Sequence, residues 1–133
     1  MRAGGRHGFT LIELLIVVVI IGILAAIAIP KFASTKEKAY IAAMKSDLHS
    51  LATAQEVYSV DQRPNAYAPD LASLAGYFTP TTGVSLNITF SGPSGWSAVA
   101  THAAIPAPYS CAYFYGNAAP VAPAVNAGEV RCG

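Results

Sequence analysis

With 133 residues, the chain has room for one modest domain in addition to one long helix. Apolar residues make up 53% of it and charged residues only 11%, and the formal net charge is +1 at pH 7. This balance argues against nucleic acid as a principal partner, because proteins that bind nucleic acid present a strongly basic surface.

An apolar segment follows a short polar one. Residues 1–8 are rich in glycine, contain two arginines and have no acidic residue. From Phe9 to Ile29 the chain carries a single charge, that of Glu13. A helix over these residues would measure about 31 Å, which is close to the thickness of the hydrocarbon core of a bilayer. The segment is therefore predicted to span a membrane.

A cleaved secretory signal is the alternative reading of the apolar segment. Its apolar part would usually be about 7 to 15 residues long and would end in small residues. The small residues at 25–28 leave cleavage after Ala28 open. However, a carboxylate inside a membrane costs about 2.5 to 3.5 kcal/mol at mid-span and less near an end. Glu13 therefore indicates a function that a secretory signal does not need.

The start of the apolar segment resembles a known signal. Gly8-Phe9-Thr10-Leu11-Ile12-Glu13-Leu14, followed by an aliphatic run with Gly22 and Pro30, is similar to the class III signal of type IV prepilins and their pseudopilin relatives. The resemblance covers about residues 1–60. It implies cleavage after Gly8 by the prepilin peptidase, methylation of the new amine on Phe9, and polymerisation through the helix.

Cleavage after Gly8 would create a partner for Glu13. The amine of Phe9 would lie four residues before the carboxylate, in apolar surroundings. The two charges can pair within one chain, since residues i and i+4 face each other on a helix, or between neighbouring chains in a filament. The family favours pairing between chains. A location of Glu13 at the level of the lipid headgroups is the third reading.

Charge does not determine how the segment crosses the membrane. Two arginines precede it, and four lysines follow it between residues 31 and 45, partly offset by two acidic residues. The positive-inside rule therefore gives no clear orientation. The resemblance implies that the amino terminus is cytoplasmic.

Gly22 and Pro30 are the weak points of the predicted helix. Glycine costs about 1 kcal/mol relative to alanine in a helix, and proline about 3 kcal/mol, because Pro30 has no N–H to donate. Unpaired backbone is expensive in lipid, so we expect this stretch to stay helical in the membrane. The resemblance implies that residues 22–30 bend or melt in an assembled filament.

Beyond Pro30 the pattern becomes amphipathic. Apolar or neutral residues recur at spacings of three and four: Ile41, Met44, Leu48, Leu51, Gln55 and Tyr58. Charged residues, Asp47 among them, are expected to lie outside this stripe. No helix breaker occurs between residues 31 and 63, and Pro64 is expected to end the helix. The sequence thus predicts one helix from about residue 10 to about residue 61, with a stripe for a small sheet to cover.

The rest of the chain predicts a loop and a small sheet. Residues 64–83 are rich in proline and glycine and are expected to form a connection with a helical turn near 70–75. Tyr67, Tyr77 and Phe78 are expected to pin this connection to the domain. Apolar and polar residues alternate over 84–91, which predicts a strand with Phe90 on its apolar face.

Further strands are predicted over 96–102, 110–115 and 129–132. A turn at 92–95 would join the first two strands into a hairpin. Residues 116–128 are rich in Gly, Ala, Pro and Asn and are expected to form an exposed loop. The predicted fold class is therefore α+β, with a long amino-terminal helix packed against an antiparallel sheet of three or four strands.

Cys111 and Cys132 are the two cysteines of the chain. In an oxidising compartment they are expected to form a disulfide, which stabilises a loop of this size by about 3 kcal/mol. A metal site would need more ligands. The arrangement resembles the carboxy-terminal disulfide region of many type IV pilins.

Other residues that suggest chemistry have simpler interpretations. His7, His49 and His102 are scattered and do not have the spacing of metal ligands. Asn87-Ile88-Thr89 matches a glycosylation acceptor but falls inside a predicted strand. An aromatic cluster at 109–115 is expected to pack near the disulfide. No catalytic, cofactor or metal site is predicted.

The resemblance implies a structural subunit of a type IV pilus. The chain would consist of a leader (1–8), an apolar assembly helix (9–30), an amphipathic helix (31–63) and a head (64–133). It would be inserted in the inner membrane and then assembled with copies of itself into a filament on the bacterial surface. A cytoplasmic ATPase would supply the energy through a membrane platform protein.

Three alternatives remain open from the sequence. The first is a pseudopilin of a type II secretion system, a class that usually carries an acidic calcium-binding loop near the carboxy terminus. Residues 104–133 contain one acid, Glu129, and a predicted disulfide instead, which favours a pilin. The second is a minor pilin. The third is a membrane-tethered binding or enzymatic domain, which would be neither cleaved nor assembled.

Overall fold

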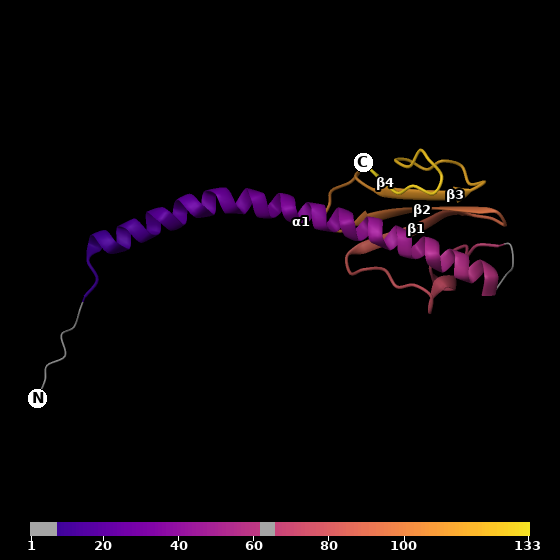
Figure 1. The fold of residues 1–133 in the computed structure, drawn as a ribbon, viewed down its shortest axis with the longest axis horizontal. Helices are drawn as coiled ribbons and strands as arrows, with labels where there is room; N and C mark the ends of the chain where they lie inside the picture. Colours follow the sequence, from indigo (N-terminus) through magenta and orange to yellow (C-terminus); the bar gives the residue numbers. More distant parts are fainter. Residues whose placement is uncertain (1–7, 62–65) are drawn as a thin grey trace, which may run out of the picture. The chain divides into compact units, whose positions relative to one another are not determined.

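The computed structural model describes residues 8–61 and 66–133. Its longest element is helix α1 (Leu11–Asp61), which is continuous over 51 residues (Figure 1). The chain divides into two compact units, one that ends at Lys36 and one that covers Glu37–Gly133. The helix bounds match the prediction, while the leader before Gly8 and the expected helix terminator Pro64 lie outside the described residues.

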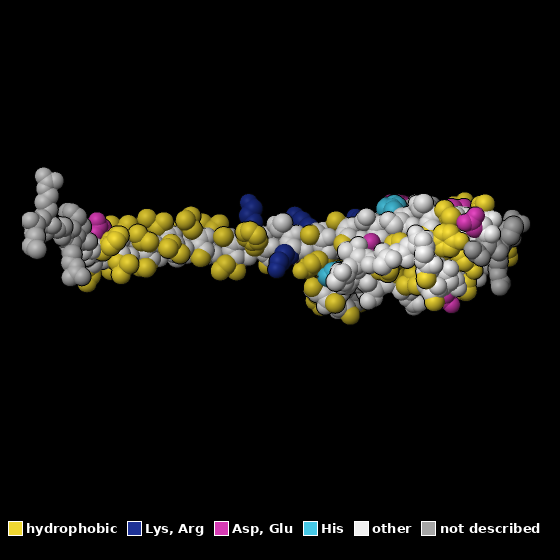
Figure 2. Space-filling model, turned by 90° about the horizontal axis from the view of Figure 1, so that it is seen from below, with side chains coloured by type: hydrophobic (Ala, Val, Ile, Leu, Met, Phe, Trp, Pro, Cys, Tyr) yellow, Lys and Arg dark blue, Asp and Glu magenta, His cyan; other side chains and the backbone are white. Residues whose placement is uncertain are grey.

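The first unit contains the apolar part of α1. Its large aliphatic side chains from Leu11 to Ile29 are all at least half exposed, and Figure 2 shows apolar side chains over this part of the helix. The helix is long and apolar enough to cross a membrane. It continues through Gly22 and Pro30. A helix that is apolar on every side needs lipid or other protein around it.

The second unit contains the remainder of α1, which buries one face. The buried residues recur at spacings of three and four: Met44, Asp47, Leu48, Leu51, Ala54, Gln55 and Tyr58. The predicted stripe is confirmed except at two positions. Ile41 is only partly buried, and Asp47, which we expected among the exposed charged residues, is 5% exposed.

The buried face of α1 belongs to a core shared with a four-stranded antiparallel sheet. The strands follow chain order: β1 (Val84–Ser91), β2 (Gly95–His102), β3 (Cys111–Gly116) and β4 (Arg131–Cys132). Trp96 on β2 and Tyr113 on β3 are buried with their ring centroids 5.0 Å apart. The short helix η1 (Ala72–Leu74) lies in the connection between α1 and β1, near the predicted position. The predicted α+β class and the hairpin are confirmed.

The prediction for Phe90 was wrong. Its side chain is 46% exposed, whereas Val84 and Leu86 earlier on β1 are buried. The pairing of β1 with β2 shifts between Ile88 and Phe90, which leaves Thr89 as an extra residue. Such a bulge reverses the alternation of the side chains beyond it.

The prediction of an exposed loop at 116–128 was also wrong in part. Ala118 and Ala124 are buried, and they form a second apolar cluster with Ala112 and Phe114 of β3. The neighbouring residues Cys111 and Tyr113 of β3 belong to the core on α1. Because successive residues of a strand face opposite sides, this loop covers the face of the sheet that is turned away from α1. Figure 1 shows the loop beside β3.

Candidate assembly site

Thr10 and Glu13 form a capping box at the start of α1. The backbone N–H of Thr10 donates to Glu13 Oε2 at 2.8 Å, and the Thr10 hydroxyl donates to the same oxygen at 2.9 Å. In return, the N–H of Glu13 donates to Thr10 Oγ1 at 3.3 Å. These bonds satisfy backbone groups that have no partner inside the helix, and they determine that the helix begins at Leu11.

The surroundings of Glu13 are otherwise apolar. Ile12 and Leu14 are both 64% exposed, and Phe9 is 90% exposed. Among the described residues Glu13 has no cationic partner. Its carboxylate can accept further hydrogen bonds, because it has two oxygens and its bonds with Thr10 use only one of them. The site therefore holds one acid with spare acceptor capacity in an apolar surface.

Sequence reasoning placed Glu13 correctly as the lone charge of the segment but missed its partner Thr10. The signal was present, since Thr10-Leu-Ile-Glu13 before an apolar run is the pattern of a capping box. The pairing of Glu13 with the amine of Phe9 stays a prediction, because Phe9 is still joined to Gly8 in this structure.

A second set of contacts fixes the connection between α1 and β1. Gln55 is fully buried, and its side chain donates to the carbonyl of Ala68 at 3.1 Å and accepts from the Ala68 N–H at 2.7 Å. The two oxygens of Asp47 accept from the N–H of Thr81 at 2.7 Å and from its hydroxyl at 2.8 Å. Two polar residues on the buried face of α1 thus hold both ends of the connection.

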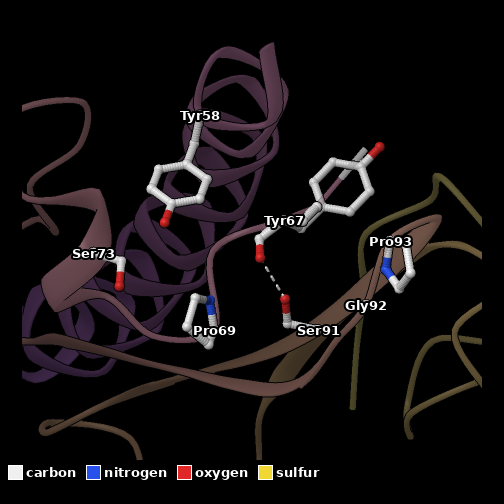
Figure 3. A pocket seen from close by; sticks show the side chains of 8 residues that line it. Tyr58, Tyr67, Pro69, Ser73, Ser91, Gly92 and Pro93 are labelled. Carbon is white, nitrogen blue, oxygen red and sulfur yellow. Dashed lines mark hydrogen bonds between the residues drawn. The ribbon is translucent and has the colours of Figure 1, made fainter. Parts of the chain in front are cut away.

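Tyr67 anchors the same connection, as predicted for the aromatic residues of this segment. Its hydroxyl donates to Glu56 Oε1 at 3.0 Å, and its carbonyl accepts from the hydroxyl of Ser91 at 2.8 Å (Figure 3). Burial, reinforced by the hydrogen bond to Glu56 and its negative charge, raises the pKa of the Tyr67 phenol to about 12. Burial likewise raises the pKa of Tyr113. Tyr77 lies edge-on to Tyr58 of α1, with ring centroids 6.2 Å apart.

A small pocket lies beside Tyr67, between α1, the connection and the end of β1. It has a volume of about 310 Å³, and Figure 3 shows Tyr58, Pro69 and Ser73 around it. Among the described residues, those that line it include Ser73 and Ser91 with their hydroxyls but no histidine, cysteine or lysine. Asp70 nearby accepts hydrogen bonds from the N–H and hydroxyl of Ser73, which lower the pKa of its carboxyl, so it serves as a cap in this turn.

The carboxy-terminal region is closed by a Cys111–Cys132 disulfide. The bond joins paired residues of β3 and β4, and reciprocal backbone hydrogen bonds of 3.0 Å between Ser110 and Gly133 extend this pairing. Glu129 accepts a hydrogen bond from the side chain of Asn126 at 2.7 Å. Within the described ranges, no group of three or more His, Cys, Asp or Glu side chains is placed to hold a metal ion.

The prokaryotic N-terminal methylation motif matches residues 4–29, the segment that contains Phe9 and Glu13. The chain is 39% identical over 104 residues to the type IV major pilin protein PilA of Myxococcus xanthus, which covers 77% of the chain and 45% of that protein. It is 41% identical over 61 residues to the type II secretion system core protein G of Pseudomonas aeruginosa, which covers 46% of the chain and 43% of that protein. The chain belongs to the family of type IV pilins and their pseudopilin relatives.

The relatives of the chain include both pilins and pseudopilins. The type IV wide pilus major component PilA4 of Thermus thermophilus is 39% identical over 84 residues, which covers 63% of the chain and 61% of that protein. The chain thus spans less than two thirds of each of these three relatives. The methylation motif at residues 4–29 includes Thr10 and Glu13, the two residues of the capping box.

Proposed function

We propose that the chain is a structural subunit that polymerises through its amino-terminal helix into a type IV pilus on the bacterial surface. It would first be inserted in the inner membrane, where the prepilin peptidase cuts after Gly8 and the amine of Phe9 is methylated. A platform protein and a cytoplasmic ATPase would then drive assembly. The role is mechanical, and no catalytic step is assigned to the chain.

The observation that carries this proposal is the lone carboxylate of Glu13 in a helix that is apolar on all sides. Such a helix is stable in lipid or against other apolar helices, but not in water. In either place a charge needs a counter-charge. The free amine of Phe9 in a neighbouring copy supplies it, so that each added copy neutralises one that is already assembled.

We propose that the stretch between Gly22 and Pro30 loses its helical structure and becomes extended during assembly. Pro30 leaves the carbonyl of Ala26 without its usual donor, and Gly22 lowers the helix propensity. Inside a filament, neighbouring helices can shield the backbone that lipid cannot satisfy.

Two observations favour a pilin over a secretion pseudopilin. The matches to the two pilus proteins extend over 104 and 84 residues, whereas the matches to the secretion core proteins G cover 56 to 77. The carboxy-terminal region is closed by a disulfide, and its single acid, Glu129, is bonded to Asn126. An acidic calcium loop, the mark of the major pseudopilins, would need further carboxylates.

Substitution of Glu13 tests the proposal against a purely local role. Glu13→Ala should leave membrane insertion intact and reduce the yield of sheared filaments more than about tenfold. The reason is that removing one partner of a buried ion pair costs about 3–5 kcal/mol, and each 1.4 kcal/mol is a factor of ten. Thr10→Ala is the matched control, because it removes the capping box at a cost of about 1 kcal/mol but keeps the charge.

Electron microscopy of sheared material and mass spectrometry of the mature amino terminus give the readout. Filaments from Thr10→Ala but not from Glu13→Ala support pairing between subunits. Equal loss in both variants means that Glu13 acts through the cap alone. An uncleaved chain that never assembles points to a tethered domain instead.

A further inference from the structure

We propose that the loop between β2 and β3 of one subunit, residues 103–110, inserts its exposed prolines into the pocket beside Tyr67 of a second subunit. This inference rests on the proposed polymerisation, to which it adds a specific contact outside the apolar assembly helix. The loop and the pocket both belong to the second compact unit, Glu37–Gly133. They lie at its opposite ends, so one copy cannot make the contact with itself.

The arrangement of α1 and the sheet defines these two ends. At one end, Tyr40 of α1 stacks on His102, the last residue of β2, with ring centroids 4.2 Å apart. At the other end, Tyr58 of α1 lines the pocket together with Gly92 and Pro93, which follow β1. The 18 residues from Tyr40 to Tyr58 rise about 27 Å along the helix, and the eight residues of β1 span a similar distance. Copies displaced along α1 therefore bring the pocket end of one unit against the loop end of the next, a head-to-tail contact of the kind that builds open filaments.

The loop presents a fixed apolar tip. Residues 106–108, Pro-Ala-Pro, are exposed, whereas Ile105 beside them is buried. The N–H of Ile105 donates to the carbonyl of His102 at 3.0 Å, and the N–H of Tyr109 donates to the carbonyl of Pro106 at 3.3 Å. Because proline fixes its own backbone dihedral φ and the base of the loop is hydrogen-bonded, the tip has little conformational entropy to lose on binding.

The pocket offers an apolar surface of matching chemistry. The rings of Tyr58, Tyr67, Pro69 and Pro93 contribute to its lining, and its volume is about 310 Å³. The hydroxyls of Tyr67 and of the two serines in the lining are hydrogen-bonded within the chain. Figure 3 shows the hydroxyl of Tyr58 turned toward Pro69, where it can donate to a carbonyl of an inserted loop. Aromatic-lined grooves with such donors are a recurrent binding site for proline-rich segments.

The charges at the two ends also fit a head-to-tail contact. Glu56 and Asp70 accept hydrogen bonds from residues of the pocket lining, so two carboxylates lie beside the pocket. Residues 103–110 contain no acid. At the loop end, residues 37–45 of α1 carry two exposed lysines and one exposed glutamate, a net charge of +1. The pocket should therefore accept a neutral or basic tip and exclude an acidic one.

Disulfide cross-linking in sheared filaments tests the contact. The native cysteines are bonded to each other, and Ala107 and Pro93 lie too far apart to be bridged within one chain. Filaments of the double variant Ala107→Cys with Pro93→Cys should therefore give a ladder of covalent multimers after mild oxidation. The matched control is Ala107→Cys with Val60→Cys, because Val60 is 75% exposed and lies two residues after Tyr58, on a different side of α1.

The sign of the charge at the tip is tested separately. Ala107→Asp places an acid against the carboxylates beside the pocket and should lower the filament yield several-fold. Ala107→Lys changes the same exposed position and should lower the yield less. Thermal unfolding of the unassembled variants, which should match that of the unsubstituted chain, checks that the domain still folds.

A ladder from the Pro93 pair that is several-fold stronger than that from the Val60 pair, together with the difference between Ala107→Asp and Ala107→Lys, supports the contact. Normal filaments with no ladder from the Pro93 pair, or with covalent dimers alone, overturn the contact and leave the proposed function intact. A ladder that appears only when Pro120→Cys replaces Ala107→Cys also overturns it, because the pocket then holds the other proline-rich loop. A processed, unsubstituted chain that forms no filament overturns both proposals.

Discussion

Asp47 and Gln55 show how single polar residues determine the position of a loop. Both lie on the buried face of α1, and both use their side chains to bond the backbone of the connection to β1. A buried carboxylate without partners would be costly, but Thr81 supplies an N–H and a hydroxyl to Asp47. Asp47 and Gln55 therefore stabilise the second unit only while the connection between α1 and β1 is bonded to them.

Asp47→Ala should destabilise the second unit by about 1–3 kcal/mol, because the Thr81 donors lose their acceptor in a partly buried site. The measurement is denaturant unfolding of the full chain in detergent, followed by the fluorescence of the buried Trp96. Asp61→Ala, at an exposed position on the same helix, should change the free energy of unfolding by less than about 0.5 kcal/mol. Equal effects of the two substitutions would contradict the role of Asp47.

Tyr67 makes stability depend on pH at the alkaline end. Its folded pKa of about 12 lies above the ordinary value of 10.0, so the neutral phenol is favoured by folding. This contribution is fully present below pH 10 and is lost as the pH rises through about 12. The free energy of unfolding should therefore fall less between pH 9 and pH 12 in Tyr67→Phe than in the unsubstituted chain. Tyr109→Phe is the control, and an unchanged slope in Tyr67→Phe would argue against the effect.

Among the elements, strand β3 packs on both of its faces and also carries one end of the disulfide. One of its faces belongs to the core on α1, and the other packs against the loop that follows it. Its first residue, Cys111, is tied to Cys132 on β4, so the same strand also holds the carboxy-terminal loop in place. The 117–130 loop depends on this disulfide more than α1 does, because the apolar cluster that holds the loop contains only a few residues.

Replacing both cysteines with serine should lower the free energy of unfolding of the second unit by about 3 kcal/mol, as expected for a loop of this length. The loss should appear first in the 117–130 loop. Amide hydrogen exchange should show its protection falling, for example at the Gly128 N–H, which donates to the Phe114 carbonyl at 2.8 Å. Protection in the buried part of α1 should change less. Equal loss in both regions would show that the disulfide stabilises the whole unit instead.

Sequence patterns predicted this fold where the signal is local. The spacing of three and four gave the buried face of α1, and alternation gave β1 and its hairpin. Asp47 could not be placed, because its partner Thr81 is 34 residues away and meets it only in the folded chain. Phe90 was misplaced because a bulge depends on the partner strand. At the assembly site, the sequence identified Glu13 as the lone charge of its segment, but its hydrogen bonds with Thr10 were not predicted.

For the molecule as a whole, the two parts of α1 are suited to different surroundings. Its first part needs lipid or neighbouring helices, while its second part carries the core of a domain that is stable around it. A change of conformation during assembly is therefore expected in the first part, where Gly22 and Pro30 weaken the helix and the backbone is not fixed by a sheet.

Residues 22–30 should be helical in the membrane-bound subunit and extended in the filament. Cryo-electron microscopy of filaments, compared with amide exchange of the detergent-solubilised chain, measures this. The variant Gly22→Ala with Pro30→Ala removes both weak points and should keep more of the stretch helical in filaments. Continuous helical density through this stretch in filaments of the unsubstituted chain would refute the idea.

The reciprocal bonds between Thr10 and Glu13 also bear on what happens before and after polymerisation. In the proposed membrane-bound subunit, Glu13 would not be a bare acid, because Thr10 at the start of the same helix donates two hydrogen bonds to it. Joining a filament would then replace one satisfied arrangement with another, and the driving force would be only the difference between them. Under the proposed function, a small difference would make each addition of a subunit easy to reverse.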